Sequence, residues 1–466
     1  MSAMPRFASL ILLACLASVS LSAAPNIVLI LADDLGWRDV GFHGAEWKTP
    51  NIDRIAKEGV DVDRFYATPI CTPTRAGLLT GRYPLRSGIQ RITVKSWGNR
   101  ALADNEVLIP QGLERVGYRT RAMVGKWHLG WTRRAHHPMS RGFTSFYGLG
   151  GGAVGFFSHE SLGGLDWHRD WKISYDEGYS TTLLGQEAEK VIDAADGPFF
   201  LYVAFNAIHT PNDVVSEVWD RFAHIKDEKR RAKAAMTTSL DDEVGRILDA
   251  LDRKGIAGDT LVWFFSDNGG AIPSGSVNLP LRDGKWAVYD GGIRTVSALR
   301  WPKGVRGGRK LTEPVSYIDV FPTLLAAAGV TDHKGPKFDG EDVLDVIRGE
   351  RTRDDWVFHS YFQGQRIPTP GHERNAVIDG GWKLVRLGPN LREVSDPAKN
   401  ATFELYAIED DPFEERDVAD KNPEVVRRLA ASMVEFRKLQ QKKTQKVLIR
   451  PPAEFDPPKE WVIPMR

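Results

Sequence analysis

Polar side chains follow four apolar runs of the chain, each at the point where the run ends. The runs cover residues 26–32, 118–124, 198–205 and 260–266. The polar side chains that follow them are Asp33, Asp34, Lys126, His128, His209, Asp267 and Asn268. Any one of them is explained by ordinary turn formation. Ligands of open α/β sheets bind beyond the carboxyl ends of the strands, so four such ends together predict one polar site along a sheet edge.

Two of these strand ends supply the oxygen donors of a hard cation site. Asp33, Asp34 and Asp267 offer carboxylates and Asn268 offers an amide oxygen. Such donors suit Ca²⁺ or Mg²⁺ better than zinc or copper. Ca²⁺ accepts six to eight oxygens in flexible geometry, so the pattern favours Ca²⁺ over octahedral Mg²⁺.

The segment Cys71-Thr72-Pro73-Thr74-Arg75 places a thiol in an unusual setting. Proline suits the first turn of a helix, so we expect Cys71 at a helix N-terminus, where backbone N–H groups attract anions. Arg75 lies four residues further on and would bring a positive charge to the same face. On these residues alone, a thiolate nucleophile remains one interpretation.

The elements that position these groups have the pattern of an α/β fold. The apolar runs are continuous, as in parallel strands that are covered on both faces. Segments 51–59, 238–251 and 315–328 between or after them are predicted to be helical. The alternation of the two patterns predicts a mostly parallel sheet flanked by helices.

The cysteine segment resembles the signature C-x-P-x-R of the formylglycine-dependent, type I sulfatase family. Further blocks that match the family are residues 32–36 (ADDLG), 49–53 (TPNID), 125–130 (GKWHLG) and 266–270 (SDNGG). The resemblance spans about residues 25–420. Within the family, residues 157–160 (FSHE), 209–211 (HTP) and 279–286 (LPLRDGKW) are most similar to arylsulfatase B, the N-acetylgalactosamine 4-sulfatase.

The resemblance implies a cofactor, a modified residue and a mechanism. One Ca²⁺ ion would be held by Asp33, Asp34, Asp267 and Asn268, with Cys71 beside it after conversion to Cα-formylglycine. In the family the aldehyde is hydrated; one hydroxyl attacks sulfur, the alcohol leaves, and the second hydroxyl expels sulfate. The conversion requires a partner, either a formylglycine-generating enzyme or an anaerobic sulfatase-maturating enzyme.

The resemblance also implies roles for the basic residues. Arg75, Lys126 and Lys285 would hold the formylglycine and the sulfate, since developing charge needs preorganised cations. His209, or Lys285, would protonate the leaving oxygen, and His128 would take a proton from the remaining hydroxyl. The two histidines can be exchanged in these roles. Lys126, His209 and Lys285 would contact the substrate, with Ser158 and His159 as further substrate-binding candidates.

A different pattern begins near residue 354. Short strand-like segments at 356–362, 375–387 and 403–406 predict an antiparallel sheet, and a helix is predicted over 423–441. The proline-rich stretch 451–464 is predicted to be extended. We therefore divide the chain into a catalytic domain at 25–353 and a C-terminal subdomain at 354–466. The family resemblance implies an alkaline-phosphatase-like fold for the whole.

The composition limits the classes of function. The chain has 466 residues, 62 basic and 61 acidic, so no overall charge points to nucleic acid or a membrane surface. Two cysteines exclude a disulfide scaffold. Residues 1–24 combine a basic start, an apolar middle and small residues at the end, which predicts a signal peptide and export to the periplasm or medium. An uncleaved anchor and a lipoprotein modified at Cys15 are the alternatives.

Taken together, the sequence predicts an exported hydrolase of sulfate esters. A sulfated glycan is the expected substrate, with exo action expected by analogy to the family. Two other classes remain open: a phosphonate or phosphate-ester hydrolase of the same superfamily, and a catalytically silent glycan-binding protein if Cys71 stays a thiol. The adjacent His136 and His137 are expected at the surface or in a substrate loop rather than on a metal.

Overall fold

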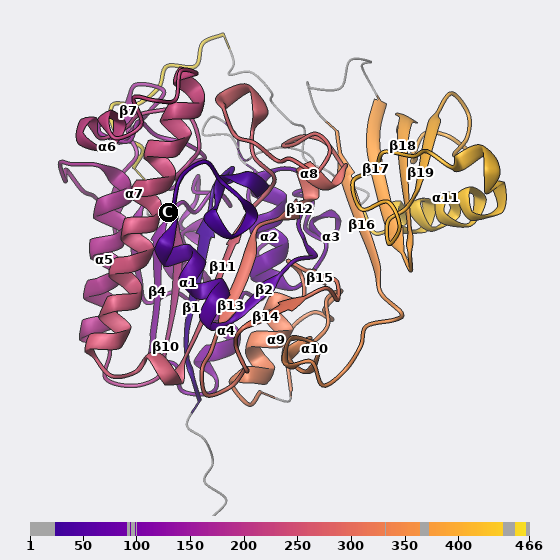
Figure 1. Ribbon diagram of the computed structural model, residues 1–466. Coiled ribbons are helices and arrows are strands. Elements are labelled where there is room, and N and C mark those ends of the chain that lie inside the picture. The colour runs from indigo at the N-terminus through magenta and orange to yellow at the C-terminus, as the bar shows by residue number, and fades with distance from the viewer. Residues whose placement is uncertain are drawn as a thin grey trace, which may run out of the picture.

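A ten-stranded sheet forms the centre of the protein in the computed structural model, which describes residues 24–90, 94, 98, 100–330, 332–363, 372–440 and 453–462 (Figure 1). Its spatial order is β14-β2-β13-β11-β1-β10-β4-β5-β8-β9. In that order the strands are Arg309–Leu311, Val60–Val62, Ser297–Arg300, Thr260–Ser266, Asn26–Ala32, Phe199–Ala204, Thr120–Gly125, Ser145–Gly148, His168–Arg169 and Lys172–Ile173. The five strands from β11 to β5 are parallel, so their carboxyl ends share one edge.

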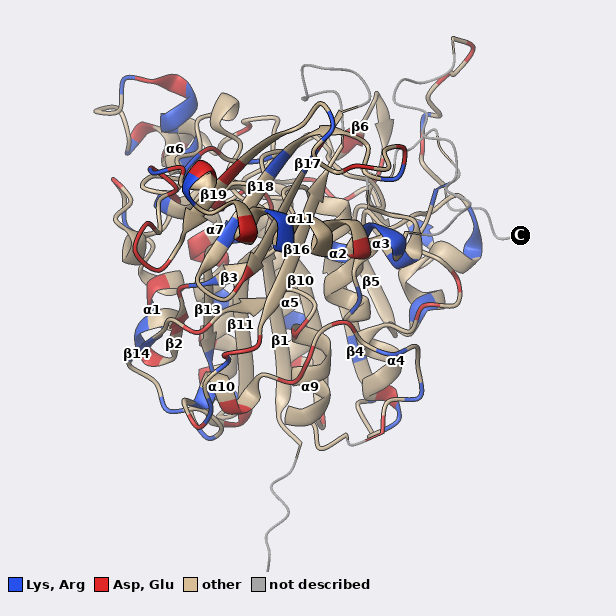
Figure 2. Cartoon of the chain, turned by 90° about the vertical axis from the view of Figure 1, so that its right-hand side faces the viewer, with Lys and Arg blue, Asp and Glu red and all other residues tan. Residues whose placement is uncertain are grey.

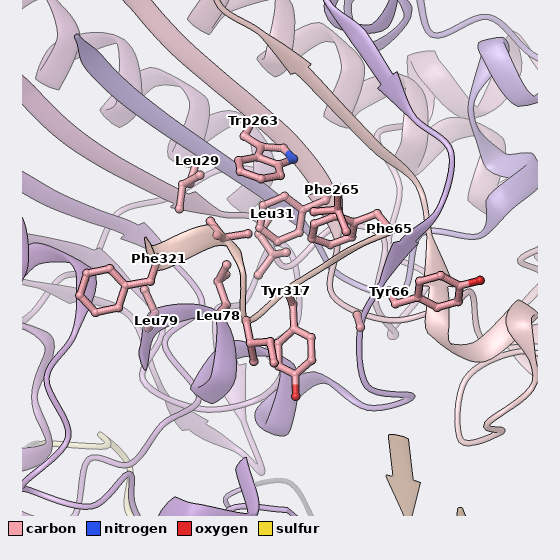
Figure 3. Packing of buried hydrophobic residues seen from close by; sticks show 14 of the residues in the cluster. Leu29, Leu31, Phe65, Tyr66, Leu78, Leu79, Trp263, Phe265, Tyr317 and Phe321 are labelled. Atoms are coloured by element: carbon pink, nitrogen blue, oxygen red, sulfur yellow. The ribbon is translucent and has the colours of Figure 1, made fainter. Parts of the chain in front are cut away.

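Both faces of this sheet are buried. Along β1, Ile27, Leu29 and Leu31 face one core, whereas Val28 and Ile30 face another. Figure 3 shows Leu29 and Leu31 packed among Trp263, Phe265 and other aromatic side chains of the first core. Burial on two faces explains why the strands read as continuous apolar runs in the sequence.

Eleven α-helices lie in the described part of the chain. They are α1 (Pro50–Glu58), α2 (Cys71–Thr80), α3 (Pro84–Ser87), α4 (Ile109–Glu114), α5 (Ser180–Ala194), α6 (Ser216–Asp220), α7 (Glu228–Arg253), α8 (Asp290–Ile293), α9 (Val320–Ala327), α10 (Leu344–Arg348) and α11 (Pro423–Lys438). Helices α2, α4 and α9 cover one face of the sheet, and α1, α5 and α7 cover the other. The result is the three-layer α/β architecture predicted from the sequence.

A second, four-stranded sheet lies toward the C-terminus, at the right of Figure 1. Its antiparallel strands, in order, are β16 (Val357–Phe362), β17 (His372–Asp379), β18 (Trp382–Pro389) and β19 (Thr402–Ala407). Helix α11 covers one face through Leu429 and Met433, which pack on Val377, Leu384 and Leu405. Two small sheets complete the fold: β12 (Arg294–Thr295), β3 (Phe65–Tyr66) and β15 (Val315–Ser316), and the pair β6 (Glu160–Ser161) and β7 (Gly164–Leu165).

The elements differ from the sequence predictions in three places. The segment 315–328 is a short strand followed by α9 rather than one helix, and 375–387 contains two strands that turn at Gly380. Helix α7 has 26 residues and begins ten residues before the predicted start, because Asp227 caps it through the Arg230 N–H. Residues 1–23 of the predicted signal peptide, Cys15 included, lie outside the described residues.

Charged side chains of both signs are interspersed over the surface elements (Figure 2). Strands β1, β10 and β11 in the middle of the central sheet contain no charged residue, and they are tan in Figure 2. None of the helices in the described ranges is both long enough and apolar enough to cross a membrane.

Candidate active site

Strands β1 and β11 end side by side and deliver the acidic residues. Ala32 is paired with Ser266, and the Asp267 N–H donates to the Ala32 carbonyl at 3.0 Å. Asp33, Asp34, Asp267 and Asn268, which follow the two strands, are all buried. The parallel register therefore brings together two pairs of oxygen donors that lie more than 230 residues apart in the sequence.

Cys71 is the first residue of α2, as Pro73 predicted. Its side chain is buried, and its Sγ lies 3.5 Å from His128 Nδ1. Burial raises the pKa of the Cys71 thiol, although Lys126 and Lys285 act in the opposite direction. An unmodified Cys71 therefore stays a thiol near neutral pH, which argues against the thiolate nucleophile considered from the sequence.

Three buried cations neutralise the acidic residues. Arg75 Nε and Nη2 donate to Asp267 Oδ2 at 3.0 and 2.8 Å. Lys126 Nζ contacts Asp33 Oδ2 at 2.5 Å, and Lys285 Nζ contacts both oxygens of Asp34 at 2.6 and 2.7 Å. The Arg75 guanidinium also donates to the Lys126 carbonyl, so α2 and the end of β4 are fixed to each other.

The two histidines approach the acidic residues from different strand ends. His128 follows β4, has a φ of 57°, and donates its backbone N–H to the Gly150 carbonyl. A Cβ on Gly152 would lie 2.5 Å from His128 Nε2, so the glycine loop packs directly against this ring. His209 follows β10, and its Nε2 lies 3.7 Å from Asp34 Oδ2. Burial, reinforced by Lys285, lowers the pKa of His209 to about 4.

The backbone joins the His209 loop to the end of β1. The Asp33 N–H donates to the Ala207 carbonyl, and the Ile208 N–H donates back to the Asp33 carbonyl, each at 2.8 Å. Behind this pair lies Lys233 of α7, a buried lysine whose Nζ donates to the Ile208 carbonyl. Sequence reasoning missed Lys233, although a lysine on the buried face of a predicted helix is a usable signal.

The donor set fits a divalent cation. Asp33 Oδ1 and Asn268 Oδ1 are buried and have no hydrogen-bond partner among the described residues. One ligand atom from each of Asp33, Cys71 and Asp267 can be chosen so that all three lie within 4.8 Å of one another. Burial, followed by the negative charge of Asp33, raises the pKa of Asp267 to about 7, because buried carboxylates that lie close together repel one another. Unpartnered buried oxygens beside repelling carboxylates are what a bound Ca²⁺ would stabilise.

Two further substrate-binding candidates lie elsewhere in the glycine-rich loop. Ser158 is exposed, and its Oγ accepts from the Glu160 N–H. His159 is buried and stacks on Trp167 with a centroid separation of 4.3 Å, the environment of a packed core residue. His136 and His137 are also buried, contrary to the expectation of a surface position. Burial lowers the pKa of His137 to about 3, consistent with its stacking on Trp171.

Two family models match the chain. The sulfatase model matches residues 25–330. The model for the C-terminal part of N-sulphoglucosamine sulphohydrolase matches residues 283–442. Together they cover both sheets and every element that contributes to the site.

Similar proteins and structures agree with this match. Arylsulfatase J of Mus musculus is 32% identical over 458 residues, covering 90% of this chain and 76% of the relative. Human N-acetylgalactosamine-6-sulfatase is 34% identical over 372 residues, which cover 74% of this chain and 69% of the relative. The crystal structure of Ps i-CgsB in complex with k-i-k-neocarrahexaose has a TM-score of 0.81 and 32% identity, covering 90% of this chain and 94% of that one. The chain therefore belongs to the sulfatase family of sulfuric ester hydrolases, as the cysteine segment and the strand ends predicted.

Proposed function

We propose that this protein hydrolyses sulfate esters of a sulfated glycan, with a formylglycine derived from Cys71 and one Ca²⁺ ion. The observation that carries the proposal is the convergence at Cys71: a helix N-terminus, three buried cations and four buried oxygen donors come from five separate segments. A doubly charged or singly charged oxyanion would meet preorganised positive groups in such a site.

In this proposal, the Ca²⁺ ion and the formylglycine each supply chemistry that ordinary side chains lack. Asp33, Asp34, Asp267 and Asn268 would hold the Ca²⁺, which supplies positive charge to a sulfate oxygen. Formylglycine at position 71 supplies, when hydrated, a hydroxyl nucleophile that a cysteine lacks.

The chain's own residues orient the nucleophile, bind the sulfate and transfer protons. Arg75, buried against Asp267, orients the side chain at position 71 from within α2. Lys126 and Lys285 bind the sulfate oxygens, and each is paired with a buried carboxylate, Asp33 and Asp34 respectively. His209 or Lys285, which both lie beside Asp34, would donate the proton to the leaving oxygen, and His128, whose Nδ1 faces position 71, would accept a proton there.

A glycan is the proposed substrate because relatives in the family are named for sugars. N-acetylgalactosamine-6-sulfatase is 34% identical to this chain, and Ps i-CgsB, at 32% identity, was solved in complex with neocarrahexaose. We further propose export to the periplasm or medium, with residues 1–24 as the signal and a cellular maturation enzyme acting on Cys71. Exo action on the chain end stays a prediction, as does the specific likeness to arylsulfatase B.

The experiment that tests the proposal compares paired aryl esters on purified protein. 4-Nitrophenyl sulfate and 4-nitrophenyl phosphate share a leaving group, so their kcat/KM ratio reports the preference for the transferred group. We expect the sulfate to be favoured by orders of magnitude. A phosphate preference would instead support the phosphonate or phosphate-ester hydrolase.

The state of Cys71 is measured on the same preparation. Conversion of –CH₂SH to –CHO lowers the mass of the peptide that contains residue 71 by about 18 Da. We expect this loss in active material. An intact thiol in fully active protein would overturn the formylglycine proposal, and an intact thiol in inactive protein would support the silent glycan-binding alternative.

A further inference from the structure

A groove of about 490 Å³ lies beside the loop that carries His209. The loop after β10, helix α6 and the first turn of α7 form its walls. The lining residues that matter here are Asn212, Ser216, Trp219, Asp220, Glu228 and Lys229. This volume is in the range that small-ligand sites occupy.

Hydrogen bonds connect the groove to the active site. Asn212 Nδ2 donates to the Ser274 carbonyl at 3.1 Å, and Lys229 Nζ donates to the Pro273 carbonyl at 2.9 Å. Two residues further on, Ser276 Oγ donates to the Asp34 carbonyl. The segment 273–276 therefore touches the groove at one end and Asp34 at the other. Helix α6 lies beside the upper part of α7 in Figure 1, and α7 begins at the carboxyl edge of the sheet because it joins β10 to β11.

Trp219 gives the groove a fixed aromatic wall. The Arg231 guanidinium lies 4.0 Å from its ring centroid and also donates to its carbonyl, so the ring is held from one side. Trp219 is only half-buried and lines the groove. Aromatic faces pack against the C–H faces of sugar rings, so a held, accessible indole suits such a ligand.

The polar lining matches the hydroxyl groups of a sugar. The Asn212 amide is held through its Nδ2, and its buried Oδ1 has no hydrogen-bond partner among the described residues. Asp220 and Glu228 add two acceptors, and Lys229 adds a donor.

The groove has no excess of positive charge. Asp220 is paired with Arg231 at 3.6 Å, and Glu228 and Lys229 carry opposite charges. Such a lining offers no counter-charge to the sulfate of a sulfated ring, whereas a neutral, hydroxyl-rich ring needs none. The catalytic site has the opposite character, because Arg75, Lys126 and Lys285 converge there.

We propose that this groove binds an unsulfated sugar ring of the glycan, adjacent to the ring whose sulfate ester is cleaved. The inference rests on the proposed sulfatase function and assigns its substrate a second recognised unit. Trp219 is the residue that gives most of the preference for a chain over a single sugar.

The test measures kcat/KM on a matched series of substrates. The series contains N-acetylgalactosamine 4-sulfate and 6-sulfate as monosaccharides, as disaccharides with an unsulfated hexose, and as disaccharides with a sulfated hexose. The control substrate is 4-nitrophenyl sulfate, which is too small to reach the groove. For wild type we expect the neutral disaccharide to be preferred over the monosaccharide by about tenfold, and over the doubly sulfated one by at least as much.

The variants Trp219→Ala and Trp219→Phe identify the source of that preference. Trp219→Ala should equalise the neutral disaccharide and the monosaccharide and leave 4-nitrophenyl sulfate hydrolysis unchanged. Trp219→Phe retains a ring and should keep most of the preference. An unchanged ratio in Trp219→Ala, or no chain preference in wild type, would overturn the proposal.

A failure of the proposed sulfatase function gives a different result from a failure of the groove proposal. If wild type releases no sulfate even from 4-nitrophenyl sulfate, the sulfatase proposal fails while the groove is still tested by calorimetry. Binding of the neutral disaccharide to wild type that weakens in Trp219→Ala would support the groove. Equal heats of binding in the two proteins would reject it.

Discussion

Cys71 is a buried position that the proposed conversion to formylglycine would make reactive. Its Sγ lies at the start of α2, 3.5 Å from His128, in surroundings that raise the pKa of the thiol. The neighbouring cations therefore do not serve to make a thiolate. In the proposed function they bind the sulfate ester and orient the group that replaces the thiol.

Replacing Cys71 by alanine tests this separation of chemistry from stability. We expect Cys71→Ala to lower kcat on 4-nitrophenyl sulfate by at least a thousandfold. We expect the free energy of unfolding to change by no more than about 1–2 kcal/mol, because one small buried side chain is removed. Urea titration and initial rates check both expectations. Near-normal activity in this variant would remove Cys71 from the mechanism.

Removal of calcium tests the oxygen donors independently of turnover. Asp33 Oδ1 and Asn268 Oδ1 have no described partner, and carboxylates converge beside them, so calcium should stabilise the folded state. Adding calcium at about a hundred times its Kd should stabilise the chelator-treated protein by about 2.7 kcal/mol, measured as a rise in Tm.

The matched variants for this prediction are Asp267→Asn and Asp249→Asn. Asp267 lies in the donor set, whereas Asp249 is an exposed carboxylate on α7. Atomic emission should find about one calcium per chain in wild type and in Asp249→Asn, and much less in Asp267→Asn. Equal calcium contents would rule out the proposed ligand set.

At the scale of elements, α7 supports the loop that carries His209. The Lys233 ammonium is buried, donates to the Ile208 carbonyl, and has its pKa lowered to about 8 by burial. Such a group is costly to bury and is retained where it fixes a backbone position. Lys233 is therefore a positioning residue for His209 rather than a group that contacts the substrate.

Lys233→Met keeps the aliphatic stem and removes the donor. We expect kcat to fall by about 10–100-fold with a smaller change in KM, because small displacements of a catalytic group have effects of this size. Lys190→Met, at an exposed lysine of α5, is the control. A lower Tm with unchanged kcat would mean that Lys233 contributes only to stability.

The apolar pattern of the sequence predicted where the central strands lie. It did not predict features that depend on contacts between distant segments. Continuous apolar runs located β1, β10 and β11 within one residue, since burial on both faces imposes that pattern. The break between β17 and β18 was missed because apolar residues occur on both sides of it and only Gly380 and Gly381 mark the turn. Lys233 was missed because helical periodicity gives a residue's face but not the carbonyl it meets. The roles of Arg75 and Lys285 came from family resemblance, since spacing alone does not pair them with Asp267 and Asp34.

For the whole molecule, the C-terminal sheet is attached close to the active site. Lys383 of β18 is fully buried, and its Nζ lies 2.6 Å from Asp290 of α8 and 2.6 Å from Glu414. Helix α8 follows the Lys285 loop within five residues. The second sheet therefore anchors the segment that carries Lys285, the proposed catalytic lysine.

Lys383→Met tests this attachment. Leaving two buried carboxylates without their cation should lower the free energy of unfolding by about 3–5 kcal/mol. Activity should fall as well, because α8 no longer fixes the Lys285 loop. Arg428→Met breaks the exposed ion pair with Asp379 and should cost less than about 1 kcal/mol. Similar losses in the two variants, measured by urea titration, would contradict the assigned role of Lys383.

The mutual backbone hydrogen bonds between Asp33 and residues 207–208 have a consequence for how such proteins diversify. They tie the reactive groups to the rigid ends of β1 and β10, whereas the groove is built from the segment 212–229 that emerges beyond them. Insertions or exchanges in that segment can alter which sugar is recognised without disturbing bond cleavage. If the groove binds sugar as proposed, exchanging residues 212–229 between relatives should change the glycan preference and leave sulfate ester cleavage intact.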